Sequence, residues 1–420
     1  MPTARLTEAV AGAFLPRPPD SIGVAVSGGG DSMALLHLMH DLAKRHDTRL
    51  FAVTVNHNLR EGAEAEARAV GDYCAALGVP HDILIWDDWD GKGNLQASAR
   101  DARYRRMAEW AEHLGVGTIA VGHTADDQAE TVLMRLGRRA GVDGLAAIPP
   151  RTVRHGIVWV RPLLSVTRAD LRWYLRQNGI GWSEDPSNDD NRFVRIKARQ
   201  ALAALGDLGI DASGLAVVAA QMRDARSALD WQTFLAAREL AHVNAGAVVL
   251  QERRLRIQPE EIQRRLLVRA LGWVSGNDYP PRRTAVATLM AALRAGQAAT
   301  VDGCHALRVD EDIWVFREHE AVRHLRSCPG VPWDGRWRVM PIQGHERPAK
   351  DLHIAALGHE GIAQCAEWRA AGLPFPVALS TPAVWRDDTL VAAPLVGAAQ
   401  NWHAALQAGE ETFFAGLLSH

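Results

Sequence analysis

The sequence predicts an α/β protein whose first domain is a doubly wound, Rossmann-like parallel sheet, followed by a helical domain and a small α+β C-terminal domain. In the first half of the chain, short apolar runs alternate with helical spacings, and a glycine-rich turn follows the first run. From about residue 200, helical patterns dominate and short strand-like pieces come late. We therefore expect domains over residues 1–200, 201–328 and 329–420.

The first domain is expected to alternate strands and helices, because this order gives parallel strands with helices on both faces. The expected strands are residues 22–26, 51–55, 82–85 and 118–122. The expected helices are residues 33–46, 61–77, 94–113 and 125–138. Residues 158–161 are predicted as an edge strand, and residues 167–177 as a helix with Thr167 as its N-cap.

The rest of the chain is predicted as helices that end in a β-ribbon, followed by a linker at residues 329–332 that contains two prolines. Helical spacing covers residues 200–205, 214–242, 259–273 and 282–295. Strand-like pieces lie at residues 248–251, 256–258, 300–302, 306–309 and 313–316. Residues 333–420 show little periodicity.

Composition argues against several classes of protein. The 47 basic and 49 acidic residues give a net charge of −2, which excludes a uniformly basic nucleic-acid-binding protein. The four cysteines form no CxxC pair, which argues against a cysteine-based zinc site and a disulfide framework. No apolar run reaches the roughly 18 residues of a membrane span, and the first 25 residues carry charges unlike a signal peptide. We expect a cytoplasmic protein.

The strongest local motif follows the first expected strand and opens the first expected helix. It consists of Ser27, Gly28, Gly29, Gly30, Asp31 and Ser32. Backbone N–H groups at a helix N-terminus favour an anion, and glycines let a phosphate approach the backbone closely. The chain has no Walker lysine motif and no G-x-G-x-x-G, so the loop differs from both of those nucleotide-binding types.

A second motif, residues 122–131, follows the fourth expected strand. Asp127 and Glu130 are spaced i,i+3 and share one helix face near the carboxyl end of the sheet, where they could hold a cation or a substrate ammonium. Taken alone, they also fit acids favoured by the helix dipole. The segment around Arg103 reads as a solvated helix face, and His37 with His40 as packing rather than a metal pair. The metal ligands stay unknown.

Together these motifs resemble the PP-loop ATP pyrophosphatase group and, within it, the tRNA(Ile)-lysidine synthetase family. The likeness covers roughly residues 20–200 and weakens beyond. Thr124 and Arg139 depart from the family pattern, which often has histidine and glycine there. The supporting motifs, in family order, are residues 27–32, 55–60, 99–104, 122–131, 144–145, 161–164 and 184–188.

The resemblance implies a ligase that uses ATP to adenylate the wobble cytidine of a tRNA(Ile) with a CAU anticodon. Free lysine then attacks carbon 2 of that base, AMP leaves, and the product is lysidine. The loop of residues 27–32, with Asn56 and His57, would bind ATP. Asp127 and Glu130 would bind lysine, and Arg103 its carboxylate or the adenylated intermediate. Asp31 would position either Mg²⁺ or the incoming amine. A homodimer is plausible for this family.

Basic stretches suit the tRNA partner despite the neutral total. Residues 131–176 hold nine arginines against two acids, and residues 192–199 hold four basic residues and no acid. Phosphate contacts position a nucleic acid, while base contacts specify it. We expect Arg192, Arg195 and Arg199 to line the tRNA path.

Three other classes of protein share parts of this sequence pattern. A PP-loop enzyme that adds sulfur to tRNA would favour cysteine pairs, and a relative with an amidotransferase domain would need an N-terminal nucleophilic cysteine where this chain has Pro2. A non-catalytic protein that binds tRNA or nucleotides would not need Asp31, Asp127 and Glu130 together.

Overall fold

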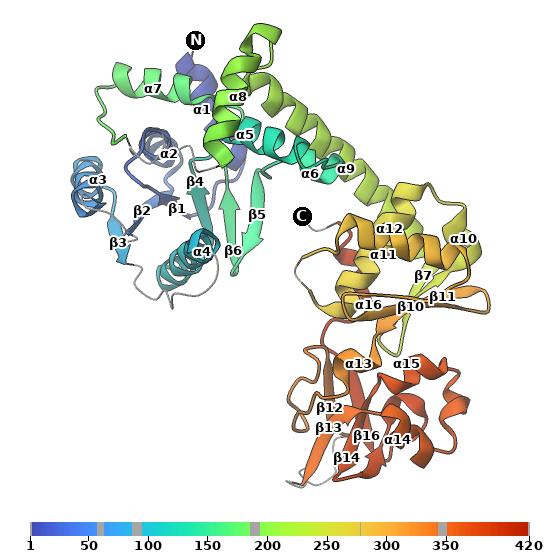
Figure 1. The fold of residues 1–420 in the computed structure, drawn as a ribbon. Coiled ribbons are helices and arrows are strands. Elements are labelled where there is room, and N and C mark those ends of the chain that lie inside the picture. Colours follow the sequence, from blue (N-terminus) through green and yellow to red (C-terminus); the bar gives the residue numbers. More distant parts are fainter. Residues whose placement is uncertain are drawn as a thin grey trace. The chain divides into compact units, whose positions relative to one another are not determined.

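The computed structural model describes residues 2–56, 63–85, 95–184, 194–277, 279–342 and 351–418. The chain divides into two compact units, Met1–Arg226 and Ser227–His420, and the long helix α9 (Ala212–Leu240) contains the boundary (Figure 1). The predicted division into three domains, with boundaries after residues 200 and 328, stays a prediction.

Within the described part of the first unit, six strands form one sheet in the order β3-β2-β1-β4-β6-β5. Neighbours from β3 to β6 pair in parallel, and only the last pair, β6 with β5, is antiparallel. The predicted parallel α/β sheet is therefore confirmed. The strands are β1 (Ser21–Ala25), β2 (Arg49–Asn56), β3 (His81–Ile85), β4 (Thr118–Val121), β5 (Arg151–Arg154) and β6 (Ile157–Val160).

The prediction of an edge strand at residues 158–161 was wrong. Residues 158–161 were expected at the edge of the sheet, but β6 lies second from the edge and β5 covers it. The two strands form a hairpin whose turn residues, His155 and Gly156, have φ values of 51° and 76°. Positive φ at both central residues is typical of the tight turn that matches the twist of paired strands.

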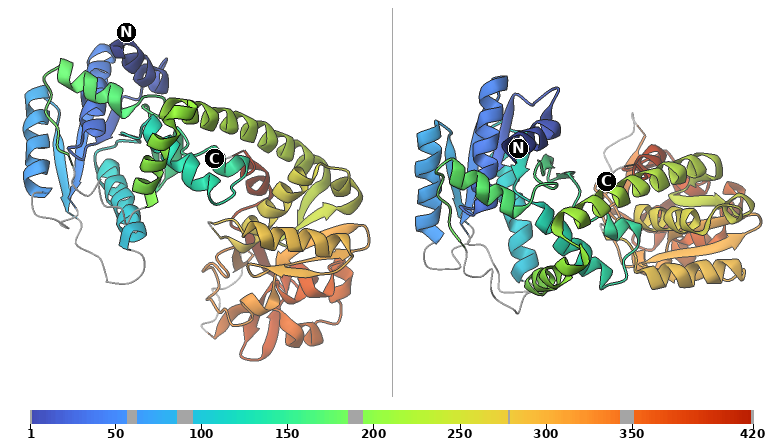
Figure 2. Two further views of the ribbon diagram at one scale, coloured as in Figure 1. Left: turned by 45° about the horizontal axis from the view of Figure 1, so that its top comes forward. Right: turned by 90° about the horizontal axis from the view of Figure 1, so that it is seen from above.

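Helices cover both faces of this sheet (Figure 2). One apolar cluster joins β1 and β2 to α1, α2, α3 and α7, and a second joins β1, β2, β4 and β6 to α4. The two clusters follow from the alternation of side chains along each strand: Val24 belongs to the first and Ala25 to the second. The helices are α1 (Pro2–Phe14), α2 (Gly30–His46), α3 (Ala63–Leu77), α4 (Leu95–His113) and α7 (Arg168–Gln177).

The remaining elements of the first unit follow β4 and α7 in the chain. Val132 of α5 packs with Ala147 and with Ala219 from the start of α9. Arg139 has φ 57°, in the left-handed region that favours glycine. This conformation explains why the sequence pattern described above often has glycine at this position. These elements are α5 (Ala125–Leu136), α6 (Val142–Leu145), α8 (Val194–Leu205) and the 3₁₀ turn η2 (Gly206–Leu208).

The second unit is built on a five-stranded antiparallel sheet in the order β7-β8-β11-β10-β9, larger than the expected β-ribbon. Helices α11 and α12 pack on one face. The prediction of a strand at residues 256–258 was wrong, since Arg256 ends helix α10 and Ile257 is its C-cap. The elements are β7 (Ala241–Asn244), β8 (Ala247–Gln251), α10 (Glu252–Arg256), α11 (Glu260–Ser275), α12 (Arg283–Arg294), β9 (Ala299–Val301), β10 (Cys304–Val309) and β11 (Asp312–Arg317).

The C-terminal segment packs on the other face of that sheet. Val249 and Trp314 of the sheet share an apolar cluster with Ala355 and Trp385. The expected linker is not free chain, since Gly330 N–H donates to Val339 O at 2.9 Å. The elements are α13 (His319–Val322), β12 (Trp337–Pro341), β13 (Leu352–Ala356), α14 (Gly358–Gln364), η3 (Trp368–Ala371), α15 (Phe375–Leu379), β14 (Pro382–Arg386), β15 (Thr389–Ala392), η4 (Pro394–Val396), β16 (Trp402–Leu406) and α16 (Glu410–Ala415).

No single helix in the described ranges has the length and apolar composition of a membrane span. One bent pair, Arg195–Leu208 with Ala212–Leu240, reaches those limits only when its two helices are taken together across a 99° bend.

Candidate active site

The glycine-rich loop between β1 and α2 is closed by its own side chains. Ser32 Oγ accepts a hydrogen bond from Ser27 N–H at 3.1 Å and donates to Gly29 O at 2.9 Å. Gly28 has φ +85°, a conformation that an L side chain rarely adopts. The first N–H groups of a helix have no acceptor within it, so the start of α2 offers donors to an anion. This geometry suits a phosphate.

Residues 182 and 183, which follow α7, pack against the same loop. Ser183 N–H donates to Gly28 O at 2.9 Å, and Ser183 forms a parallel bridge with Gly29. Its hydroxyl donates to Glu66 Oε1 of α3 at 2.8 Å. Trp182 lies so close that a Cβ on Gly30 would meet its Cδ1 at 3.4 Å. The loop is therefore held on one side by the residues that follow α7.

The second motif places its carboxylates through a helix cap. Thr124 precedes α5, and Asp127 Oδ2 accepts hydrogen bonds from Thr124 N–H at 2.8 Å and from its hydroxyl at 3.1 Å. This is the reciprocal arrangement of a capping box. A Cβ on Gly122 would lie 3.2 Å from the Asp31 carbonyl, so glycine there lets the end of β4 approach the start of α2. The two motifs thus meet.

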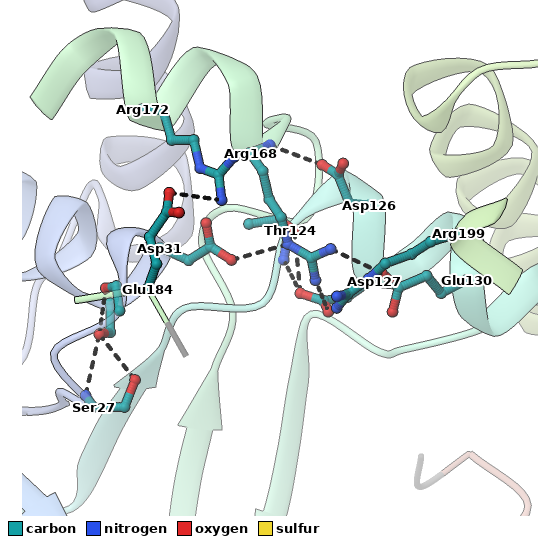
Figure 3. A network of polar contacts seen from close by, with 12 residues as sticks. Ser27, Asp31, Thr124, Asp126, Asp127, Glu130, Arg168, Arg172, Glu184 and Arg199 are labelled. Atoms are coloured by element: carbon teal, nitrogen blue, oxygen red, sulfur yellow. Dashed lines mark hydrogen bonds and ion pairs between the residues drawn. The ribbon is translucent and has the colours of Figure 1, made fainter. Parts of the chain in front are cut away.

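Arg168, the first residue of α7, joins these carboxylates (Figure 3). Its Nε donates to Asp31 Oδ2 at 3.2 Å, its Nη2 to Asp127 Oδ1 at 2.6 Å and its Nη1 to Glu130 Oε1 at 2.8 Å. Its backbone N–H donates to Asp126 Oδ2 at 2.7 Å. One guanidinium therefore bridges the start of α2 and the face of α5.

Glu130 is the deepest acid of this cluster, with a side chain only 1% exposed. Its Oε1 also accepts from Arg199 Nε of α8 at 2.6 Å. Its Oε2 is buried and has no hydrogen-bond partner among the described residues. A buried carboxylate oxygen without a partner is costly, and it favours binding of a cationic or protic group.

The carboxylates differ in acidity. Burial raises the pKa of Asp31 to about 6, the neighbouring Asp127 adds to the rise, and Arg168 only partly offsets it. Burial also acts to raise the pKa of Asp127, but Arg168, His123 and the Thr124 N–H together bring that pKa below its usual value. The shorter contact of Arg168 to Asp127 than to Asp31 agrees with this division. At neutral pH Asp127 is firmly ionised, and Asp31 is close to titration.

The structure brings Asp31, Asp127 and Glu130 together, as an active site built from both motifs requires. Asn56 is buried at the carboxyl end of β2. Arg103 is half-buried on α4, and Arg195 is exposed on α8. Arg199, expected on the tRNA path, contacts Glu130. His57 and Arg192 lie outside the described residues, and the roles of all these side chains stay predictions.

Sequence reasoning missed Arg168, which was counted only among the arginines of residues 131–176. Its contacts lie 137, 41 and 38 residues away, so no local spacing reveals them. One signal was present: Arg168 directly follows the N-cap Thr167, where the helix dipole disfavours a cation. A positive charge at that position needs carboxylate partners from elsewhere.

Comparisons with known proteins identify the family to which this chain is similar. A family model described as a PP-loop domain matches residues 2–205. A tRNA(Ile)-lysidine synthase of Ruegeria pomeroyi is 50% identical over 408 residues, which cover 97% of this chain and 96% of that relative. The synthase of Wolbachia pipientis is 35% identical and covers 76% of each chain. That of Rhodopseudomonas palustris is 39% identical over 70% of this chain and 86% of its own.

Substitution of Asp31 tests its raised pKa. Because the folded-state pKa of about 6 exceeds the unfolded value near 3.8, ionisation of Asp31 costs stability as pH rises from about 4 to 6. Asp31→Asn cannot ionise there, so its Tm relative to the unsubstituted protein should rise between pH 4 and pH 7. Calorimetric scans across that range measure the difference. A difference that is constant with pH contradicts the raised pKa.

Proposed function

We propose how this site works from one premise: the chain belongs to the tRNA(Ile)-lysidine synthase family. It is an ATP-dependent ligase that modifies the wobble position of a tRNA. In the proposed reaction, O2 of the cytidine in a CAU-anticodon tRNA(Ile) attacks the α-phosphorus of ATP, and pyrophosphate leaves. The lysine side-chain amine then attacks carbon 2, the carbon–oxygen bond to AMP breaks, and the amine loses a proton.

The observation that carries the lysine site is the unpaired oxygen of Glu130. The carboxylates of Asp31, Asp127 and Glu130 contact the Arg168 guanidinium, and Glu130 also contacts Arg199; these three acids and two arginines sum to −1 when all are ionised. A lysine ammonium at Glu130 Oε2 would reduce this negative charge and give the oxygen a donor. We assign lysine binding to Asp127 and Glu130, and contact with its carboxylate or with the intermediate to Arg103.

The loop of residues 27–32, together with Asn56 and His57, is assigned to ATP, because the start of α2 suits a phosphate. Among the described residues, no three His, Cys, Asp or Glu side chains are grouped to hold a metal alone. Mg²⁺ in nucleotide sites usually takes one or two carboxylates plus substrate phosphates, and Asp31 in the first turn of α2 fits that need. Mg²⁺ would neutralise phosphate charge there.

The partners beyond the small substrates follow from the same premise. Arg195 is exposed on the helix that carries Arg199, and we assign Arg192, Arg195 and Arg199 to the tRNA path. Arg199 would then connect that path with Glu130. A cytoplasmic location and a homodimer remain predictions from the sequence.

A single incubation tests the function. The protein is mixed with ATP, Mg²⁺, labelled lysine and a transcript of tRNA(Ile) with a CAU anticodon. We expect label in the tRNA and stoichiometric release of AMP and pyrophosphate. A tRNA(Met) transcript, which shares the anticodon, serves as the specificity control. If no lysine enters tRNA(Ile) although the protein binds ATP, the assignment fails.

Two substitutions separate the lysine site from the ATP loop. Glu130→Gln should raise the KM for lysine at least about tenfold, since a hydrogen bond to a charged group contributes about 1.5–3 kcal/mol. It should leave ATP affinity, measured by calorimetric titration, nearly unchanged. Gly28→Ala should weaken ATP binding instead, because φ +85° disfavours a side chain. Equal losses for both ligands in Glu130→Gln would show that the carboxylates are misassigned.

The tRNA path is tested by salt dependence. Arg195→Ala should weaken tRNA binding and lower the slope of log K against log salt concentration by about one, because one phosphate contact is lost. Arg17→Ala removes an equally exposed charge outside the basic stretches and should keep the slope of the unsubstituted protein. An unchanged slope in Arg195→Ala removes that residue from the tRNA surface.

A further inference from the structure

We propose that Arg168 is a positioning residue of the reaction: it holds the carboxylates of Asp31, Asp127 and Glu130 together and charged at the place where the substrate amine must arrive. The inference rests on the proposed function for the identity of that amine. The ion pairs of Arg168 with the three carboxylates all lie within the first unit and do not depend on that function.

The guanidinium has the geometry for this task. Three of its nitrogens each reach a different carboxylate, on two helices that are adjacent in space but far apart in sequence. An arginine presents its donors in a rigid planar fork, whereas a lysine presents one compact point charge. A lysine at this position would keep the charge but lose the fixed three-way spacing.

The position of Arg168 is not explained by helix stability. It is the first residue of α7, where the macrodipole disfavours a cation. The helix itself is anchored without it, since Leu171, Tyr174 and Leu175 are buried in the core shared with α2. The side chain is therefore fixed over the acids by a helix that packs independently. A residue kept at an unfavourable helix position, with three acidic partners, indicates a role in the site.

The electrostatics lead to the same role. The charged groups that face the cluster are Asp126 and His123 beside the start of α5, and Arg195 and Arg199 from α8. Arg168 precedes His123 and Arg195 among the charged groups that lower the pKa of Asp127. Without it, neighbouring carboxylates would repel one another and take up protons near neutral pH. A protonated acid neither holds an ammonium nor accepts its proton.

The test compares Arg168→Gln and Arg168→Lys with a control, Arg45→Gln. Arg45 is exposed in the last turn of α2, at the opposite end of that helix from Asp31 and outside the basic stretches. Lysine incorporation into tRNA(Ile) is measured from pH 5.5 to 9, with kcat and KM for lysine and for ATP. In Arg168→Gln, the acidic limb of kcat/KM for lysine should move up by about one pH unit or more. The KM for lysine should rise at least tenfold, and that for ATP less than threefold.

The conservative variant separates charge from geometry. Arg168→Lys should restore the acidic limb nearly to its original pH but leave kcat/KM for lysine reduced, because it retains the charge without the fork. Arg45→Gln should keep the original profile. A profile in Arg168→Gln that falls at every pH without shifting would indicate a purely structural role and would overturn the proposal.

A second readout does not require activity. Asp127 has a lowered folded-state pKa, so its contribution to stability is present at neutral pH and is lost in acid. Because Arg168 is the main charge that lowers this pKa, the Tm deficit of Arg168→Gln should be larger at pH 7 than at pH 4. A deficit independent of pH contradicts the inference. Should the unsubstituted protein transfer no lysine, the proposed function fails, and the Tm comparison still judges Arg168.

Discussion

Three carboxylates from two helices converge on one guanidinium, and the geometry of the catalytic unit is arranged around that convergence. The first turn of α2 carries Asp31, and the first turns of α5 carry Asp127 and Glu130. Both helices begin at the carboxyl ends of neighbouring parallel strands, the usual ligand crevice of such sheets. Like charges brought so close repel one another. The positive charge of Arg168, from a third helix, offsets this repulsion at neutral pH.

The parts of the site that the sequence predicts are those formed by residues close together along the chain. Residues 27–32 signal a phosphate loop because a strand, glycines and a helix follow one another directly. Asp127 and Glu130 share a helix face by spacing alone. The Arg168 contacts could not be predicted this way, since they depend on how α7 packs against α2. No element was predicted over residues 2–14, where Leu6, Val10 and Phe14 of α1 are buried in the core.

In the second unit too, the packing between distant elements could not be predicted from local sequence patterns. Its strands β8 and β11 were predicted only as strand-like pieces at residues 248–251 and 313–316, and the structure covers both faces of their sheet. Val248 and Val315 face α11 and α12, while Val249 and Trp314 face the C-terminal segment. Alternation along a strand predicts two faces but does not identify what packs on each. Residues on both sides of the proline-containing stretch 329–332 thus share one apolar cluster, and the predicted boundary after residue 328 stays a prediction.

The bridge between Ser183 and the phosphate loop has a consequence for how this catalytic machinery can change. The Gly28 carbonyl accepts a hydrogen bond from Ser183, which follows α7, so the loop is completed by residues more than 150 positions further along the chain. The glycine motif alone therefore does not specify the shape of the loop. An insertion between α7 and Ser183 that displaced this hydrogen bond would disturb the start of α2 as well.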